Sequence, residues 1–360
     1  MTTLSQAIDR IRPLCALSME EARRRQDILT KPRGSLGRLE ELSVMLAGAQ
    51  RKARPKIEHK VIFTMAGDHG VVKEGVALYP AEVTVQQVFN FLEGGGGVNV
   101  LARHAGARVV LVDMGVDYDF EPREGLQIRK VGRGTASFLR GPAMTREQAV
   151  KCLEEGIAAV EQEAGKGMDI LGVGDMGIGN TTPSSAIACA VTEVSVPLAT
   201  GRGAGLTDEG LKRKRAVIEE GLALQRPDPK DGLDVLAKVG GFEIGGIAGA
   251  IIGAASLGVP AVVDGFISTA AAAVAYLVAP SCRDYMIFSH ESVEIGHEHL
   301  LNFLNARPLL DLEMRLGEGT GAALAISLAE AAARVLDEMT TFEGAGVSGP
   351  LEPEDESPGD

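Results

Sequence analysis

The chain has 360 residues, 45% of them hydrophobic, and a formal net charge of −13. This length can form one large or two modest domains with a sizeable core. The acidic balance argues against nucleic acid or an anionic membrane as the main partner. Aromatic residues make up only 4% of the chain and glycine occurs 45 times, so small and aliphatic side chains must build the core.

The cysteines show no C-x-x-C spacing, which indicates reduced thiols in a cytoplasmic protein and not a disulfide framework or a zinc site. They are Cys15, Cys152, Cys189 and Cys282. The N-terminus is charged and lacks the apolar core of a signal peptide. Residues 245–263 carry no charge, but their glycines, alanines and Pro260 favour a helix over 246–256 and a strand over 259–263, not a membrane span.

Helical periodicity covers residues 4–27 and 37–51, with a turn at 31–37 between them. From residue 60, short β-branched runs alternate with helical segments. The expected strands are 60–66, 108–114, 168–173, 195–199, 259–263 and 284–288. The expected helices are 80–92, 97–104, 145–163, 208–224, 231–238, 242–256, 266–278, 291–304 and 320–340. This alternation predicts an α/β fold with a doubly wound parallel sheet and helices on both faces.

Residues 172–185, G-V-G-D-M-G-I-G-N-T-T-P-S-S, carry the strongest functional signal. A strand is expected to enter this stretch and a helix over 184–191 to leave it, with Thr182 as the N-cap and Pro183 as the first helical residue. Glycines let backbone amides approach a ligand, and a helix start offers free N–H groups and a positive dipole end. We therefore predict a site for a phosphate or a carboxylate.

Gly172, Gly174 and Gly177 also fit the dinucleotide pattern G-x-G-x-x-G. In that pattern the helix begins inside the motif, whereas here its expected start lies about six residues later. A nicotinamide-dinucleotide site and a structural turn without a ligand both remain open alternatives.

Four aspartates, each beside a glycine or one residue from it, lie at the ends of expected strands: Asp68, Asp113, Asp175 and Asp264. Ligands of open parallel sheets bind at the carboxyl ends of the strands, so these acids are candidates for one shared crevice. The alternative is that each aspartate caps its own turn.

Glu318 lies between two glycines in R-L-G-E-G, before an expected apolar helix. Near an apolar ligand, burial would raise the pKa of this carboxyl group and make it a stronger base. Alternatively, Glu318 complements the dipole of the following helix. A second glycine-rich loop, 201–205, precedes a basic run from which one lysine can reach a phosphate. The spacing of His290, His297 and His299 is not a standard metal pattern, and no metal is expected.

Six motifs occur in a fixed order: K-P-R-G-S-L-G-R-L-E at 31–40, G-D-H-G-V-V at 67–72, the loop at 172–183, K-V-G-G-F at 238–242, D-G-F at 264–266 and R-L-G-E-G at 315–319. Together they resemble the nicotinate-nucleotide–dimethylbenzimidazole phosphoribosyltransferase family, which prepares the lower ligand of cobalamin. The resemblance covers about residues 28–342.

The resemblance implies a Rossmann-like nucleotide-binding domain over 56–318 and a smaller helical domain formed from both chain ends, 1–55 and 319–343. It also implies a homodimer without a cofactor. The composition of residues 344–360, with prolines and acids, predicts a disordered tail.

The implied activity is transfer of the phosphoribosyl group from nicotinate mononucleotide to 5,6-dimethylbenzimidazole or a related base. Because the pyridinium leaves without needing a proton, one carboxylate base suffices, whereas most glycosidases need two carboxylates. The alternatives are a nicotinamide-dinucleotide-dependent dehydrogenase and a non-catalytic nucleotide-binding module.

The resemblance places the catalytic base at Glu318 and a benzimidazole contact at Gln87. Phosphate and ribose contacts fall on Gly177, Ile178, Gly179, Asn180 and Thr181, with further substrate contacts at Gly203, Lys214, Asp264, Ser292 and Leu316. Two substrate-binding positions depart from the family pattern: Asp175 replaces a glutamate and Tyr79 replaces a small serine. Both departures bear on the preferred acceptor base.

Overall fold

The structure, a computed structural model, describes residues 2–349. Its contacts divide the chain into two compact units. The larger unit contains the residues up to Pro13 and Ile57–Leu328, and the smaller one contains Leu14–Lys56 and the described residues from Ala329 onward. The domain boundaries expected from the sequence stay a prediction; by contacts, residues 4–10 and 319–328 group with the larger unit.

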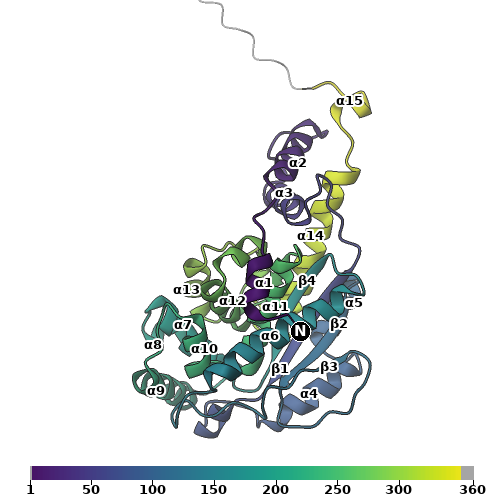
Figure 1. The fold of residues 1–360 in the computed structure, drawn as a ribbon. Coiled ribbons are helices and arrows are strands. Elements are labelled where there is room, and N and C mark those ends of the chain that lie inside the picture. Colours follow the sequence, from purple (N-terminus) through teal and green to yellow (C-terminus); the bar gives the residue numbers. More distant parts are fainter. Residues whose placement is uncertain (1, 350–360) are drawn as a thin grey trace, which may run out of the picture. The chain divides into compact units, whose positions relative to one another are not determined.

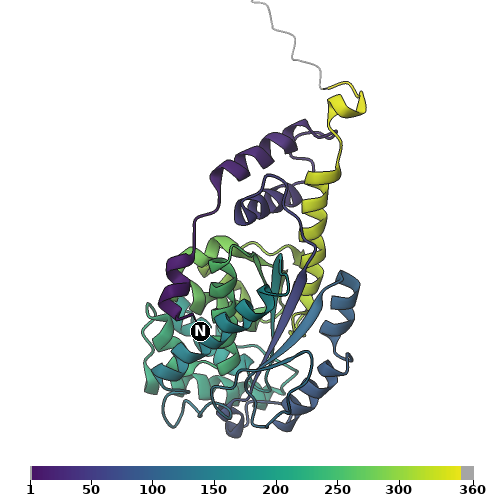
Figure 2. The ribbon, with the colours of Figure 1, turned by 45° about the vertical axis from the view of Figure 1, so that its right-hand side comes forward.

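A six-stranded parallel sheet forms the centre of the larger unit, with the strand order β3-β2-β1-β4-β5-β6 (Figure 1). The strands are β1 (Lys60–Gly67), β2 (Arg108–Gly115), β3 (Leu126–Ile128), β4 (Ile170–Met176), β5 (Ala261–Val263) and β6 (Met286–Phe288). Figure 2 shows β1 and β2 side by side. The strand order reverses between β1 and β4, and ligands bind outside the carboxyl ends of the strands at such a position.

Helices cover both faces of this sheet, as a doubly wound fold requires. On one face, Met65 and Met114 lie against Gly246 of α11 (Phe242–Ser256). On the other, Ile326 of α14 (Thr320–Glu338) lies against Gly172. The other helices of this unit include α1 (Leu4–Arg10), α4 (Glu82–Leu92), α5 (Gly97–Ala105), α6 (Arg146–Ala164), α7 (Thr181–Thr192), α8 (Val196–Ala199), α9 (Asp208–Gln225), α10 (Gly232–Val239), α12 (Phe266–Val278) and α13 (Gly296–Phe303). The expected Rossmann-like fold class is confirmed.

Several expected elements were wrong at identifiable residues. The helix expected over 4–27 ends at Arg10 and restarts at Ala16, because Pro13 cannot continue a helix. The strand expected over 195–199 is the short helix α8, whose first turn contains Pro197. The helix expected from residue 291 begins only at Gly296, after the two-residue strand β7 (His290–Glu291), which pairs with β8 (Leu310–Asp311).

The smaller unit consists of α2 (Ala16–Ile28), α3 (Arg38–Gln50), the end of α14 and α15 (Phe342–Ala345). The motif at 31–40 belongs here: the buried Lys31 ammonium donates to Glu40 Oε1 at 2.7 Å. That motif therefore stabilises a turn of this unit. The disordered tail expected from Gly344 was wrong at its first two residues, which end α15; residues 350–360 lie outside the described chain.

Within residues 2–349, no helix is both long enough and apolar enough to span a membrane. The uncharged segment 245–263 forms most of α11 and then β5, and both elements are buried. The helix-then-strand prediction for this segment is confirmed.

Candidate active site

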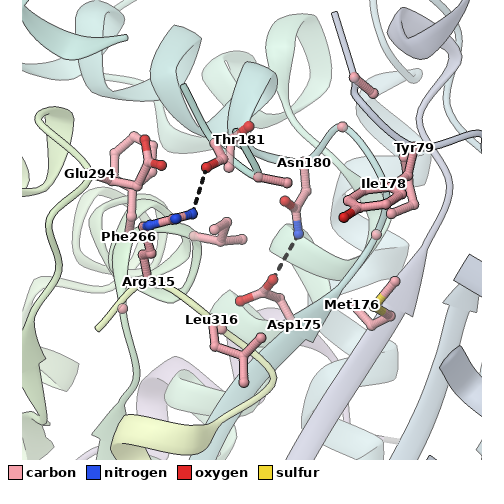
Figure 3. Close-up of a pocket in the computed structure, with 18 of the residues that line it drawn as sticks. Tyr79, Asp175, Met176, Ile178, Asn180, Thr181, Phe266, Glu294, Arg315 and Leu316 are labelled. Carbon is pink, nitrogen blue, oxygen red and sulfur yellow. Dashed lines mark hydrogen bonds between the residues drawn. The ribbon is translucent and has the colours of Figure 1, made fainter. Parts of the chain in front are cut away.

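A cavity of about 720 Å³ opens at the carboxyl end of β4 in the larger unit (Figure 3). Four chain segments contribute most of its wall: residues 76–87, the β4–α7 loop, the loop at 202–206, and residues 315–318. Gly265, Phe266, His290, Ser292 and Glu294 also line it. Segments that lie far apart in the sequence thus converge on one cavity at the reversal of strand order.

The β4–α7 loop differs in detail from the expectation. β4 continues to Met176, and α7 begins at Thr181 with Asn180 at the N-cap position, so the cap expected at Thr182 was wrong. Asn180 instead donates its side-chain amide to Asp175 Oδ2 at 2.7 Å (Figure 3). All five residues 177–181 line the cavity. The helix start and glycine amides are placed as an anion site requires.

Thr84 of α4 holds this loop from the side. Its buried hydroxyl accepts a hydrogen bond from the Ile178 amide at 3.1 Å. One turn further along α4, Gln87 lines the same cavity. The position of the loop is therefore tied to the helix that carries Gln87. Thr84 and Ile178 are 94 positions apart, and the sequence pattern did not reveal this link.

Lys214 lies behind the cavity wall and does not line it. Its fully buried ammonium donates to Thr181 Oγ1 at 2.8 Å and to the Gly201 carbonyl at 3.4 Å. Burial lowers the pKa of Lys214 to about 8, although the nearby Glu294 carboxylate opposes the shift. Arg315 joins the same region by donating to the Gly203 carbonyl at 3.2 Å. Lys214 thus positions two loops, and its expected contact with a phosphate stays a prediction.

Glu318 is buried at the cavity wall in a left-handed backbone conformation, with φ of 64°. Such a conformation is uncommon for a residue other than glycine and is typical of strained functional positions. Thr64 of β1 donates to the Glu318 carbonyl at 2.7 Å. A Cβ on Gly174 would lie 2.1 Å from the Gly319 nitrogen, so only glycine at 174 allows this turn to approach β4.

The Glu318 carboxylate faces the N-terminus of α5, where Oε2 accepts a hydrogen bond from the Val98 amide at 3.0 Å. Burial raises the pKa of Glu318, the Val98 and Gly97 amides hold it down, and the Asp264 charge raises it further; the net pKa is above the ordinary value. A carboxyl group with a raised pKa at a cavity wall is suited to accept a proton.

Asp264, and not Glu318, complements the dipole of α14, the helix that follows Glu318. Its Oδ2 accepts from the Gly319 amide at 3.0 Å and its Oδ1 accepts from the Ala322 amide at 2.9 Å, so Asp264 complements the dipole of α14. Glu318 complements α5 instead. The Asp264 side chain does not line the cavity, whereas its neighbour Gly265 does.

Of the four strand-end acids, only Asp175 lines the cavity. Asp68 accepts from the Asp117 amide at 2.8 Å, and Asp113 accepts from the Val116 amide at 2.9 Å, so these two bind backbone amides of the β2 end and its turn. The expectation of a crevice shared by all four was wrong. Burial, with repulsion from the Asp264 charge, raises the pKa of Asp175 to about 8.

The remaining expected contacts lie at the mouth and side of the cavity. Tyr79 and Leu316 line it and are at least half exposed. Gln87 accepts from the Asn90 side chain at 3.0 Å, which leaves its own amide nitrogen for a ligand. Ser292 and Gly203 also line the cavity.

His297 is a buried residue that supports the site without touching the cavity. Its Nδ1 accepts from the Ser292 amide at 2.9 Å, so Nε2 carries the proton and faces Thr269 Oγ1 at 2.9 Å. Burial and the neighbouring His290 lower the pKa of His297 to about 3, and the ring is neutral. Among the described residues, no cluster of three or more His, Cys, Asp or Glu side chains could hold a metal ion.

Comparison with known proteins agrees with this geometry. A family profile described as phosphoribosyltransferase matches residues 11–347. The chain is 56% identical over 352 residues to the nicotinate-nucleotide–dimethylbenzimidazole phosphoribosyltransferase of Roseiflexus sp. strain RS-1, covering 98% of this chain and 100% of that one. It is also 56% identical to the protein of that name from Geobacter sulfurreducens, over 97% of this chain and 99% of the relative.

A solved structure of such an enzyme from Thermus thermophilus superimposes with a TM-score of 0.88 and 43% identity, covering 94% of this chain and 100% of that one. Profile, sequence and fold thus agree over nearly the whole length. The chain belongs to the nicotinate-nucleotide–dimethylbenzimidazole phosphoribosyltransferase family.

Proposed function

We propose that this enzyme transfers the 5-phosphoribosyl group from nicotinate mononucleotide to 5,6-dimethylbenzimidazole or a related base. The products are α-ribazole 5′-phosphate and nicotinate, as in the assembly of the cobalamin lower ligand. The observation that carries this proposal is the presence of Glu318, a buried carboxylate with a raised pKa, in the same cavity wall as the glycine loop at 177–181.

In the proposed reaction, Glu318 takes the N–H proton of the benzimidazole while the other ring nitrogen attacks C1′ of the ribose. The bond between C1′ and the pyridinium nitrogen breaks, and its electron pair returns to that nitrogen, which becomes neutral as nicotinate leaves. Attack opposite the leaving group converts the β-glycoside into an α-glycoside. Only one proton moves to the protein, so one base is sufficient.

The two substrates are assigned to different residues of the cavity wall. Within the loop at 177–181 the Ile178 amide is bound to Thr84 and the Asn180 amide to the Gly177 carbonyl. The phosphate of the nucleotide is therefore assigned to the amides of Gly177, Gly179 and Thr181 at the start of α7. The base binds near Gln87, Tyr79 and Leu316, because these side chains offer an amide donor and apolar surface at the mouth. Asp175 lines the same cavity as the loop and residues 315–318, and its protonation state affects which acceptor binds.

The experiment that tests this function is incubation of the purified enzyme with nicotinate mononucleotide and dimethylbenzimidazole, with mass spectrometry for α-ribazole phosphate. Glu318→Gln should lower kcat by about 10²–10⁴-fold, the usual contribution of a general base. Glu291→Gln, an exposed neighbour of the cavity residues, serves as the matched control. Nicotinate release by Glu318→Gln at the wild-type rate would contradict the role of Glu318.

The same assay separates the alternatives. A non-catalytic module would bind nicotinate mononucleotide without releasing nicotinate. A dehydrogenase would bind NADH tightly, which fluorescence titration measures. Absence of product together with either result would overturn the proposed reaction.

We further infer a cytoplasmic homodimer. Free thiols at Cys152, Cys189 and Cys282 are consistent with a reducing compartment. Exposed apolar side chains such as Leu78 and Phe89 favour association. Sedimentation equilibrium at micromolar concentration tests the dimer, and a mass equal to one chain would contradict it.

A further inference from the structure

Residues 94–97 are four consecutive glycines between α4 and α5, and the substrate contacts described above do not account for them. The last of them, Gly97, is the first residue of α5. Its φ lies outside the left-handed region, so its backbone does not itself demand glycine. The reason for glycine at 97 must therefore lie in what surrounds it.

A Cβ placed on Gly97 would lie 2.8 Å from Leu316 Cδ2 and 3.1 Å from Glu318 Oε2. It would also lie 3.4 Å from Thr320 Cγ2. Leu316 is largely exposed and can turn away, but Glu318 is buried and held by the amides of this same helix start. The missing side chain thus leaves the space that the Glu318 carboxylate occupies against α5.

The start of α5 cannot withdraw to relieve such a contact, because Asn99 ties it to α4. Asn99 Oδ1 accepts from the Gly96 amide at 3.0 Å, and its side-chain amide donates to the Phe91 carbonyl at 3.1 Å. Asn99 is itself buried. The end of α4 and the first turn of α5 therefore form one hydrogen-bonded support for Glu318.

We propose that Gly97 is a positioning residue for the reaction: the first turn of α5 orients the Glu318 carboxylate through its amides, and glycine at 97 is what lets that carboxylate reach them. This inference rests on the proposed role of Glu318 as the base. Gly97 acts through Glu318 and does not itself line the cavity.

The charges around Glu318 decide the direction of the pH effect. Asp264, between β5 and α12, faces it and raises its pKa, and Asp175 of β4 interacts with it from the sheet. On the other side, Thr64 of β1 binds only the Glu318 backbone carbonyl. The α5 amides are the groups that favour the ionised form, so displacing the carboxylate from them raises the pKa of Glu318.

Gly97→Ala tests the proposal without disrupting the fold, because alanine suits the first turn of a helix at least as well as glycine. We expect thermal stability close to that of the wild type, because the higher helix propensity of alanine offsets the crowding against Leu316 and Glu318, and an unchanged KM for nicotinate mononucleotide. The value of kcat should fall about tenfold, since misplacement of a catalytic group by a fraction of an ångström is costly. The acidic limb of the kcat–pH profile should move to higher pH.

Gly165→Ala is the matched control, because a Cβ at this helix end meets no atom closer than 3.5 Å and Gly165 does not line the cavity. Its kcat and pH profile should equal those of the wild type. If Gly97→Ala keeps wild-type kcat and an unmoved acidic limb while Glu318→Gln is inactive, the positioning role is wrong and the proposed function survives. If Glu318→Gln is fully active, the proposed mechanism itself fails.

Discussion

Asp264 binds the chain immediately after Glu318: its carboxylate accepts hydrogen bonds from the amides of Gly319 at 3.0 Å and Ala322 at 2.9 Å. Each of the two acids thereby complements a different helix, Asp264 the start of α14 and Glu318 the start of α5. The negative charge of Asp264 also raises the pKa of Glu318. Asp264 thus fixes the place of the proposed base and increases its basicity.

Asp264→Asn should move the acidic limb of the kcat–pH profile to lower pH. Removing a nearby negative charge lowers the pKa of Glu318, so the ionised base persists in more acidic solution. A weaker base should also lower kcat, by less than about tenfold. Steady-state kinetics from acidic to mildly alkaline pH measure both effects.

The control for this prediction is Asp113→Asn, the same change at another strand end. Asp113 pairs with Lys130 at 3.0 Å and does not line the cavity, so its substitution should leave the limb in place. An acidic limb that moves upward or not at all in Asp264→Asn would contradict the assigned role.

Thr84→Val should weaken binding of the nucleotide. The substitution keeps the shape of the buried side chain but leaves the Ile178 amide without its acceptor, which allows the β4–α7 loop to move. A hydrogen bond of this kind contributes about 1 kcal/mol, so KM for nicotinate mononucleotide should rise about fivefold. Thr84→Ser keeps the hydroxyl and should restore most of the affinity; equal KM values for the two variants would refute the link between α4 and the loop.

Tyr79→Ser should change the choice of acceptor and not the reaction. Tyr79 is half exposed at the cavity mouth, so its replacement should alter stability by no more than about 0.5 kcal/mol. Removing the ring enlarges the mouth and makes it more polar. A competition assay with benzimidazole, dimethylbenzimidazole, adenine and phenols measures the product ratios, and identical ratios for wild type and variant would show that Tyr79 does not select the base.

Local patterns were sufficient to predict five of the six strands of the sheet, most of the helices and the loop at 172–183, because glycine, proline and β-branched residues restrict their own backbone. The edge strand β3 was missed, and the strand expected over 195–199 is a helix. Partners distant in the sequence could not be predicted this way. Glu318 and Val98 are 220 residues apart, and only the folded sheet brings them together. The four strand-end aspartates looked alike in sequence, yet Asp68 and Asp113 bind backbone amides away from the cavity. Proximity to a strand end thus does not show where a side chain points.

The buried pair of His69 and Glu243 gives the last prediction. His69 Nε2 lies 2.7 Å from Glu243 Oε1, and both side chains are almost fully buried. Burial alone would lower the pKa of His69, but the Glu243 charge outweighs it and the pKa is raised above its ordinary value of 6.5. The pair also lies close to the β4–α7 loop, since a Cβ on Gly177 would be 3.1 Å from His69 Nε2.

Because the folded pKa of His69 is raised, the pair stabilises the protein fully below about pH 6.5 and loses this contribution as the pH rises through the raised pKa. Urea unfolding should therefore show that His69→Gln lowers the free energy of unfolding most at acidic pH, with a difference from wild type that shrinks above neutrality. His297→Gln should behave in the opposite way: the folded pKa of His297 is lowered to about 3, so the neutral ring contributes stability above about pH 6.5 and loses it as the pH falls. A His69→Gln difference that is constant with pH would show that folding does not raise the pKa of His69, and a difference that grows as the pH rises would show that the ring stays neutral in the folded protein.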